Sequence, residues 1–102
     1  MTNPKIDKYN KKILDNKEKD FFIVFYKKGC PYCKGAMELF RRNKKSFKGY
    51  VVKDTNKILK KLIELKDLTG FNEDHTTVPI IFRKGKFIGG FDNLKEYMKD
   101  CA

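Results

Sequence analysis

Two of the three cysteines in this chain lie two residues apart in the segment KKGCPYCKGA, which spans residues 27–36. A Cys-x-x-Cys pair can act as a redox dithiol, as half of a zinc site or as a structural disulfide. Lysines stand on both sides of the pair and leave all three possibilities open. The elements around the pair and the other candidate ligands decide between them.

The residues within the pair favour redox chemistry. Pro31 directly follows Cys30, and proline is common at the first position of a helix because its missing amide hydrogen would have no partner there. Cys30 is then expected to be the N-cap residue, whose side chain accepts hydrogen bonds from the amides of the second and third helical residues, Tyr32 and Cys33. A thiolate in this place also faces the positive end of the helix dipole.

The two cysteines are predicted to differ in reactivity. A helix N-terminus and neighbouring lysines can lower a cysteine pKa from about 8.5 to between about 3.5 and 7.5, which favours a thiolate at Cys30. Cys33 lies one helical turn further along and is expected to be buried as a thiol. The sequence therefore predicts that Cys30 attacks a disulfide and that Cys33 resolves the resulting mixed disulfide.

A structural zinc site would need four ligands, and only His75 and Cys101 remain as further histidine or cysteine ligands. His75 stands next to Glu73 and Asp74 in a polar segment, where a solvated loop histidine is expected. Cys101 falls on the apolar stripe of the last expected helix, where cysteine commonly packs as a small hydrophobic residue. No metal site is therefore predicted.

A structural disulfide framework is disfavoured because three cysteines are an odd number. The longest apolar run, FFIVFY at residues 21–26, is far shorter than the roughly 20 residues of a membrane span. The N-terminal residues are polar and do not resemble a secretory signal, so a reducing, cytoplasmic location is expected.

The length of 102 residues predicts one compact domain over residues 1–102. Hydrophobic residues make up 40% of the chain, which is enough for a core and argues against disorder. The net charge of +11 favours solubility and contact with anions. Because the lysines are scattered and no arginine-rich stripe or aromatic RNA-binding motif accompanies them, nucleic-acid binding is not predicted.

Hydrophobic periodicity predicts alternating helices and strands. The run at 21–26 is continuously apolar, as in a strand that is buried on both faces. A strand–helix–strand unit followed by a hairpin predicts an α/β fold in which helices flank both sides of a four-stranded mixed sheet, in the order α-β-α-β-α-β-β-α. The expected elements are helix 5–19, strand 21–26, helix 31–44, strand 50–53, helix 56–69, loop 71–77, strands 79–82 and 86–88, and helix 94–101.

Two of the expected helices should bury a clear apolar face. Helix 31–44 is expected to bury Met37 together with its cysteine and phenylalanine. Helix 56–69 is expected to begin at a cap formed by Asp54 or Thr55. Its apolar positions are Ile58, Leu59, Leu62, Ile63, Leu65 and Leu68.

Three separated motifs connect this chain to a known family, namely Cys30-Pro31-Tyr32-Cys33, Thr77-Val78-Pro79, and Gly89-Gly90 followed by an acidic position. With the first motif placed after the first strand, residues from about 20 to about 100 resemble a dithiol glutaredoxin of the thioredoxin superfamily. The resemblance implies a thioredoxin-like fold and a glutathione-dependent thiol–disulfide oxidoreductase. Thioredoxin itself is less similar, because this chain has no tryptophan and Val24 stands where thioredoxin has a buried acid.

The same resemblance implies that glutathione is the co-substrate and that no metal is needed. The proline of the Thr-Val-Pro motif is cis in this family, and the backbone of Val78 pairs with glutathione in the manner of an added strand. The γ-glutamyl carboxylate docks at the N-terminus of the last helix, which is a natural carboxylate site. The implied glutathione-binding residues are Lys27, Tyr32, Thr77, Val78, Pro79, Gly90, Asp92 and Asn93.

The chain departs from the family pattern in three places. Asp92-Asn93 stands where the family commonly has Ser or Asp followed by Asp, and Asn93 with Glu96 also fits a capping box at the start of the last helix. Thr76 precedes the Thr-Val-Pro motif, where the family often has a basic residue. The loop 71–77 is longer than usual, and it is either inert or shapes access for protein substrates.

The predicted function is the reduction of protein–glutathione mixed disulfides through Cys30 alone, and of protein disulfides through Cys30 and Cys33. The protein is expected to be a cytoplasmic monomer that acts in electron transport, and ribonucleotide reductase is a substrate of the family. The alternative is a carrier or sensor that binds a [2Fe–2S] cluster between two protomers through the first cysteine and glutathione. The Pro-Tyr pair inside the motif argues against this alternative, since cluster-binding members mostly have CGFS.

Overall fold

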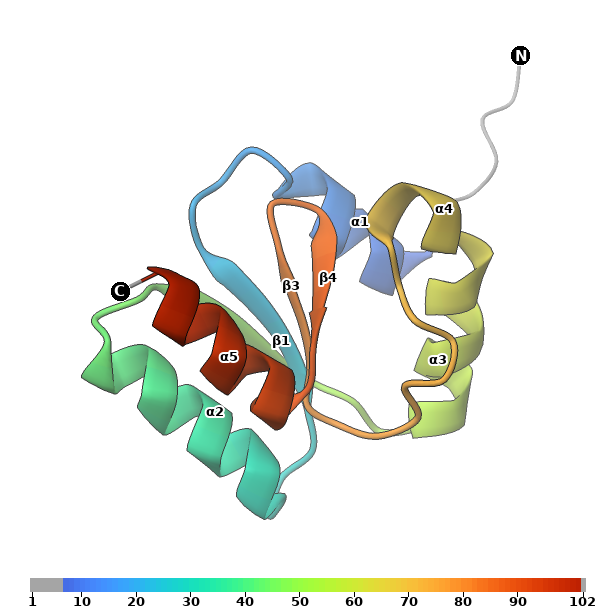
Figure 1. Ribbon diagram of the computed structural model, residues 1–102. Helices are drawn as coiled ribbons and strands as arrows, with labels where there is room; N and C mark the ends of the chain where they lie inside the picture. Colours follow the sequence, from blue (N-terminus) through green and yellow to red (C-terminus); the bar gives the residue numbers. More distant parts are fainter. Residues whose placement is uncertain (1–6, 102) are drawn as a thin grey trace.

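The computed structural model describes the backbone of residues 7–101 and the side chains of residues 7–99. Helices and strands follow each other in the order α-β-α-β-α-α-β-β-α, with one helix more than the sequence predicts. Within this described part, no helix has the length and apolar character needed to cross a membrane. The elements are α1 (Lys8–Asp15), β1 (Phe22–Tyr26), α2 (Pro31–Arg42), β2 (Phe47–Val51), α3 (Thr55–Glu64), α4 (Lys66–Thr69), β3 (Ile80–Arg83), β4 (Lys86–Gly89) and α5 (Phe91–Cys101) (Figure 1).

The strands form one mixed four-stranded sheet in the order β2-β1-β3-β4, which confirms the predicted sheet. β1 pairs with β2 in parallel and with β3 in antiparallel orientation, and β3 and β4 form the hairpin. β1 therefore has a neighbouring strand on each side. Its antiparallel register with β3 places Phe25 opposite Ile80.

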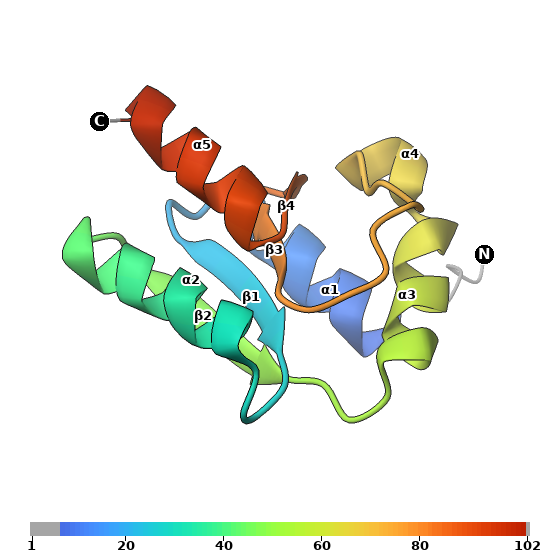
Figure 2. The same cartoon turned by 60° about the horizontal axis from the view of Figure 1, so that its bottom comes forward.

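Both faces of the sheet are covered by helices, because the side chains of β1 alternate between two apolar clusters. Phe22 and Val24 pack into the cluster on the α2 and α5 side, whereas Ile23 and Phe25 pack into the cluster on the α1 and α3 side. Figures 1 and 2 show α2 and α5 side by side on one face, with α1 and α3 on the other. A continuously apolar strand is what two covered faces require, so this prediction is confirmed.

The predicted helix 56–69 is wrong as a single element. The chain leaves the helix at Leu65, whose φ is −115°, and a short second helix, α4, follows. The break turns Leu68 outward, where it is 57% exposed, and Thr69 takes the buried position instead. The cap at the start is Asp54, whose Oδ1 accepts a hydrogen bond from the Lys57 amide at 3.1 Å.

Two other expectations near the active-site motif also need correction. Met37 is only half-buried, because the buried positions of α2 are Cys33, Ala36 and Phe40, and Met37 lies at the rim of that face. β2 begins at Phe47 rather than at residue 50, since its boundary is set by pairing with β1. The sequence of β2 shows no clear alternation of apolar and polar residues, and most of its residues stay exposed at the edge of the sheet.

The two terminal helices differ from the prediction in their bounds. α1 covers Lys8–Asp15 rather than residues 5–19, because Asp7 caps its first turn, and Ile6 lies outside the described residues. α5 begins at Phe91, three residues earlier than expected. The helix reaches Cys101, but that side chain lies outside the described part, so its burial stays a prediction.

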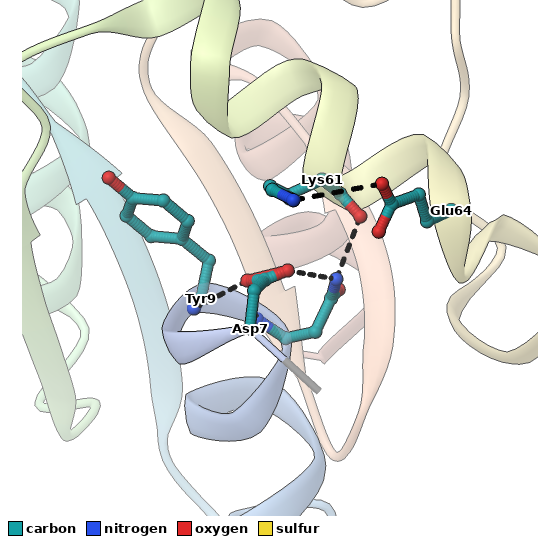
Figure 3. Close-up of polar contacts among 5 residues, drawn as sticks. Asp7, Tyr9, Lys61 and Glu64 are labelled. Carbon is teal, nitrogen blue, oxygen red and sulfur yellow. Dashed lines mark hydrogen bonds and ion pairs between the residues drawn. The ribbon is translucent and has the colours of Figure 1, made fainter. Parts of the chain in front are cut away.

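A buried polar contact joins α1 to α3. Asn10 is 2% exposed, and its Nδ2 atom donates to the backbone carbonyl of Lys61 at 2.7 Å and to Asp7 Oδ2 at 2.8 Å. The other oxygen of Asp7 accepts from the amide of Tyr9 at 2.8 Å (Figure 3). One asparagine therefore ties the N-terminal cap of α1 to the C-terminal half of α3.

Replacing this asparagine should destabilise the fold. We expect Asn10→Ala to lower the free energy of unfolding by about 1–2 kcal/mol, because both bonds from Nδ2 are lost in a buried place. The loss should lie at the low end of that range, because the substitution also removes Asn10 Oδ1. This oxygen is buried without a hydrogen-bond partner in the described part of the chain. Urea unfolding measures the change.

The matched control is Asn56→Ala, which makes the same exchange at an exposed position of α3. It should alter the free energy of unfolding by no more than about 0.5 kcal/mol. Equal losses in the two variants would contradict the role given to Asn10.

Candidate active site

Cys30 is the N-cap residue of α2, as the sequence predicts. Its backbone is extended, with φ −85° and ψ 114°, and Pro31 opens the helix. The Cys33 amide donates to Cys30 Sγ at 3.2 Å. The bond expected from the Tyr32 amide is absent from the contacts of the described residues, so one helical amide, rather than two, faces this sulfur.

Cys30 Sγ also lies near the Thr-Val-Pro segment, 48 residues further along the chain. The sulfur is 3.9 Å from the carbonyl oxygen of Val78, to which a thiol can donate. The Val78–Pro79 peptide bond is cis, as the resemblance implies. Pairing of β1 with β3 causes this approach, because Cys30 follows the end of β1 and Val78 precedes the start of β3.

The second cysteine of the pair has a different environment. Cys33 is 2% exposed, whereas Cys30 is half-buried. Burial raises the pKa of the Cys33 thiol to about 12, and its interaction with the Cys30 sulfur adds to the rise. Cys33 therefore stays protonated at neutral pH, which agrees with the predicted difference between the two thiols.

A hollow of about 200 Å³ opens next to Cys30, between the Thr-Val-Pro segment and the start of α5. Apart from Lys27, every residue that the resemblance implies for glutathione lines it. Tyr32 is 64% exposed, and its ring lies 6.3 Å from that of Phe91. The lining residues are Tyr32, His75, Thr77, Val78, Pro79, Gly90, Phe91, Asp92 and Asn93.

Lys27 is absent from the lining of this hollow. It lines a second hollow of about 430 Å³, to which Cys30, Cys33, Lys28 and Lys34 also belong. The two hollows share no lining residue. Cys30 connects them, because it lines the second hollow and its sulfur lies near Val78, which lines the first. Lys27 therefore lines a different hollow from the other residues that the resemblance implies for glutathione, and its part in glutathione binding stays a prediction.

The start of α5 corrects the reading of Asn93 as an N-cap. The Leu94 amide donates to the carbonyl of Gly90 at 2.9 Å, so Gly90 occupies the capping position. Asn93 Oδ1 accepts from the Gly90 amide at 3.1 Å and so closes the first turn from inside the helix. Gly89 has φ 132°, and a Cβ there would lie 2.4 Å from Asn93 Cγ, so this close contact needs glycine.

His75 and Phe91 line the first hollow and were both missed by sequence reasoning, and His75 is the polar one of the two. It was expected to be solvated, but it is half-buried and lines the first hollow. Its Nε2 atom lies 3.2 Å from the carbonyl oxygen of Pro79. Its neighbours Glu73 and Asp74 are exposed and polar, so the one available signal was its position a few residues before the Thr-Val-Pro motif.

The first residues of α5 line the first hollow, and a helix N-terminus carries unpaired backbone amides and the positive end of the helix dipole. Asp92 adds little opposing charge inside the hollow, since its side chain is 90% exposed and pairs with Lys95 at 3.5 Å. Among the residues whose side chains are described, no three His, Cys, Asp or Glu groups lie together as metal ligands would.

Comparison with known proteins agrees with this geometry. The glutaredoxin family model matches residues 22–88. A probable glutaredoxin of Acanthamoeba polyphaga mimivirus is 44% identical over 81 residues, which cover 76% of this chain and 76% of that protein.

Solved structures of glutaredoxins have the same fold. A dithiolic glutaredoxin from Trypanosoma brucei brucei has a TM-score of 0.66 at 26% identity, covering 98% of this chain and 92% of that one. A buckwheat glutaredoxin–glutathione complex has a TM-score of 0.60 at 27% identity, covering 95% and 87%. The chain therefore belongs to the glutaredoxin family of the thioredoxin superfamily, whose members are glutathione-dependent thiol oxidoreductases.

Proposed function

We propose that this protein reduces protein–glutathione mixed disulfides through Cys30 alone and protein disulfides through Cys30 and Cys33 together. The observation that carries the proposal is the contrast between the two thiols. Cys30 is half-buried with its sulfur at a helix N-terminus, whereas the Cys33 thiol is buried. A nucleophile and a protected second thiol are what the two routes require.

In the monothiol route, the Cys30 thiolate attacks the glutathione sulfur of the mixed disulfide. A bond forms between Cys30 and glutathione, and the protein thiolate leaves and takes up a proton. The thiolate of a second glutathione then attacks the sulfur of the bound glutathione. Oxidised glutathione leaves, and Cys30 returns as a thiolate. The Cys33 amide donates a hydrogen bond to the Cys30 sulfur, which favours Cys30 as the leaving group in this last step.

In the dithiol route, Cys30 attacks one sulfur of a protein disulfide and becomes joined to the protein. Cys33 must then lose its proton and attack Cys30, which expels the protein as a dithiol and leaves the Cys30–Cys33 disulfide. The pKa of about 12 keeps Cys33 a thiol until that step. Two glutathione molecules then reduce the Cys30–Cys33 disulfide in two exchanges, through a Cys30–glutathione mixed disulfide, and leave as one oxidised glutathione.

The first hollow is the proposed place of the glutathione moiety. Val78 offers backbone groups beside the Cys30 sulfur, and the start of α5 near Asp92 and Asn93 offers amides to a carboxylate. Lys27 lines the second hollow together with Cys30, so it is a further candidate partner for a glutathione carboxylate.

The roles of the two cysteines can be tested by single substitutions. Cys30→Ser should abolish reduction of every substrate, because serine is not ionised at neutral pH. Cys33→Ser should keep the reduction of a glutathionylated peptide within about a few-fold and lose most reduction of a disulfide-bonded protein. Both reactions are followed with glutathione, glutathione reductase and NADPH.

The glutathionylated peptide and the disulfide-bonded protein serve as controls for each other, because the same variant is assayed on both. A folded Cys33→Ser variant that loses both activities would show that the assigned roles are wrong. Activity retained by Cys30→Ser would show the same.

The contribution of Lys27 can be tested separately. Lys27→Gln should raise the KM for glutathione about two- to five-fold, because an exposed contact to a carboxylate is weakened by solvent. Added salt should reduce the difference between the variant and the wild type. Lys60→Gln, at an exposed position of α3, is the matched control and should leave the KM unchanged. An unchanged KM in Lys27→Gln would exclude Lys27 from glutathione binding.

The iron–sulfur alternative makes a different prediction for the same protein. A cluster carrier should gain visible absorbance after anaerobic reconstitution with glutathione, iron and sulfide, and Cys30→Ser should lose it. A colourless product with full reductase activity supports the proposed function.

A further inference from the structure

His75 is held in place by contacts within its own loop and with one strand, β4. A carbonyl oxygen accepts hydrogen bonds and never donates them, so His75 Nε2 carries the hydrogen that it shares with Pro79 O over 3.2 Å. The imidazole also packs edge-on against Phe87, with ring centroids 5.3 Å apart, and against Phe71 at 6.5 Å. These contacts hold the ring in one orientation against the Thr-Val-Pro segment.

The first hollow has two walls, the Thr-Val-Pro segment and the start of α5, and the second wall begins at Gly90, close to the same imidazole. A Cβ on Gly90 would lie 3.0 Å from His75 Cε1 and 3.6 Å from Pro79 O. The imidazole and the Pro79 carbonyl therefore lie so close to Gly90 that a side chain there would be crowded. His75 is hydrogen-bonded to one wall of the hollow through Pro79 and lies next to the other wall at Gly90.

The wall that contains Val78 depends on such side-chain contacts for its position. Residues 70–79 join α4 to β3 and include no helix or strand. Backbone pairing within the sheet therefore begins only at Ile80, one residue after Pro79. A bond to the Pro79 carbonyl acts close to Val78, and it can set how far Val78 lies from the start of α5.

We propose that His75 is a positioning residue that sets the separation of the two walls and thereby the affinity of the first hollow for a glutathionyl group. The inference rests on the proposed function, because it takes this hollow as the glutathione site. Cys30 Sγ has its own contacts, with Val78 O and the Cys33 amide. Loss of the His75 bond should therefore weaken binding and leave the reactivity of Cys30 unchanged.

Two substitutions separate the hydrogen bond from the packing of the ring. His75→Phe keeps an aromatic ring against Phe87 and Phe71 and removes the donor. His75→Gln removes the ring and keeps a donor, because the glutamine amide nitrogen lies as many bonds from Cα as Nε2 does. If His75 acts only by packing, glutathione binding should be kept by the variant with a ring. If it acts as proposed, binding should be kept by the variant with a hydrogen-bond donor.

Binding is measured by titrating S-methylglutathione, which cannot react, into each reduced protein. We expect His75→Phe to lower the affinity about three- to ten-fold, the effect of one net hydrogen bond. His75→Gln should bind within about two-fold of the wild type, although its thermal unfolding midpoint should fall more than that of His75→Phe. The rate of Cys30 alkylation by iodoacetamide should agree within about two-fold in all the proteins.

The control is Glu73→Gln in the same loop, whose side chain pairs with Lys66 and does not line the hollow. It should bind S-methylglutathione as the wild type does. Wild-type affinity in His75→Phe would overturn the inference, and so would equally weak binding in His75→Phe and His75→Gln. If the wild type fails to reduce a glutathionylated peptide, the proposed function itself fails, whatever the His75 variants bind.

Discussion

The antiparallel pairing of β1 with β3 is the constraint on which the rest of the structure depends. Its register sets Phe25 opposite Ile80, so the end of β1 that leads into Cys30 lies beside the start of β3. The hairpin then places Gly89 opposite Ile81 and brings the start of α5 to the same end of the sheet. Segments that are far apart in the sequence therefore meet there (Figure 2), and they enclose the hollow next to Cys30.

At that end of the sheet, two chemically identical side chains acquire different properties. Cys30 precedes the helix, so its sulfur receives an amide hydrogen bond and the residue stays half-buried. Cys33 lies within the first turn and faces the core, where desolvation disfavours its charged form. A separation of three residues around a helix start thus gives the two thiols different environments, and the proposed function assigns them different roles on that basis.

The walls of the hollow come from segments that regular structure does not fully fix. Gly90 caps α5 with the help of Asn93, so the position of one wall follows from helix geometry. The other wall includes Val78, which lies outside any strand, and its neighbour Pro79 is bonded by His75. Each wall thus has one side-chain contact to the backbone, and only the wall at Gly90 also belongs to a helix.

Local patterns in the sequence by themselves determined the apolar strand β1, the helix that begins at Pro31 and the stop at Gly70, whose φ is 75°. Each depends on interactions within a few residues, such as a missing amide hydrogen or a left-handed backbone. Only the tertiary structure decided the break at Leu65, the start of β2 at Phe47 and the burial of His75. These depend on partners that the chain meets only after folding, and no short-range pattern encodes which strand, helix or carbonyl such a partner will be.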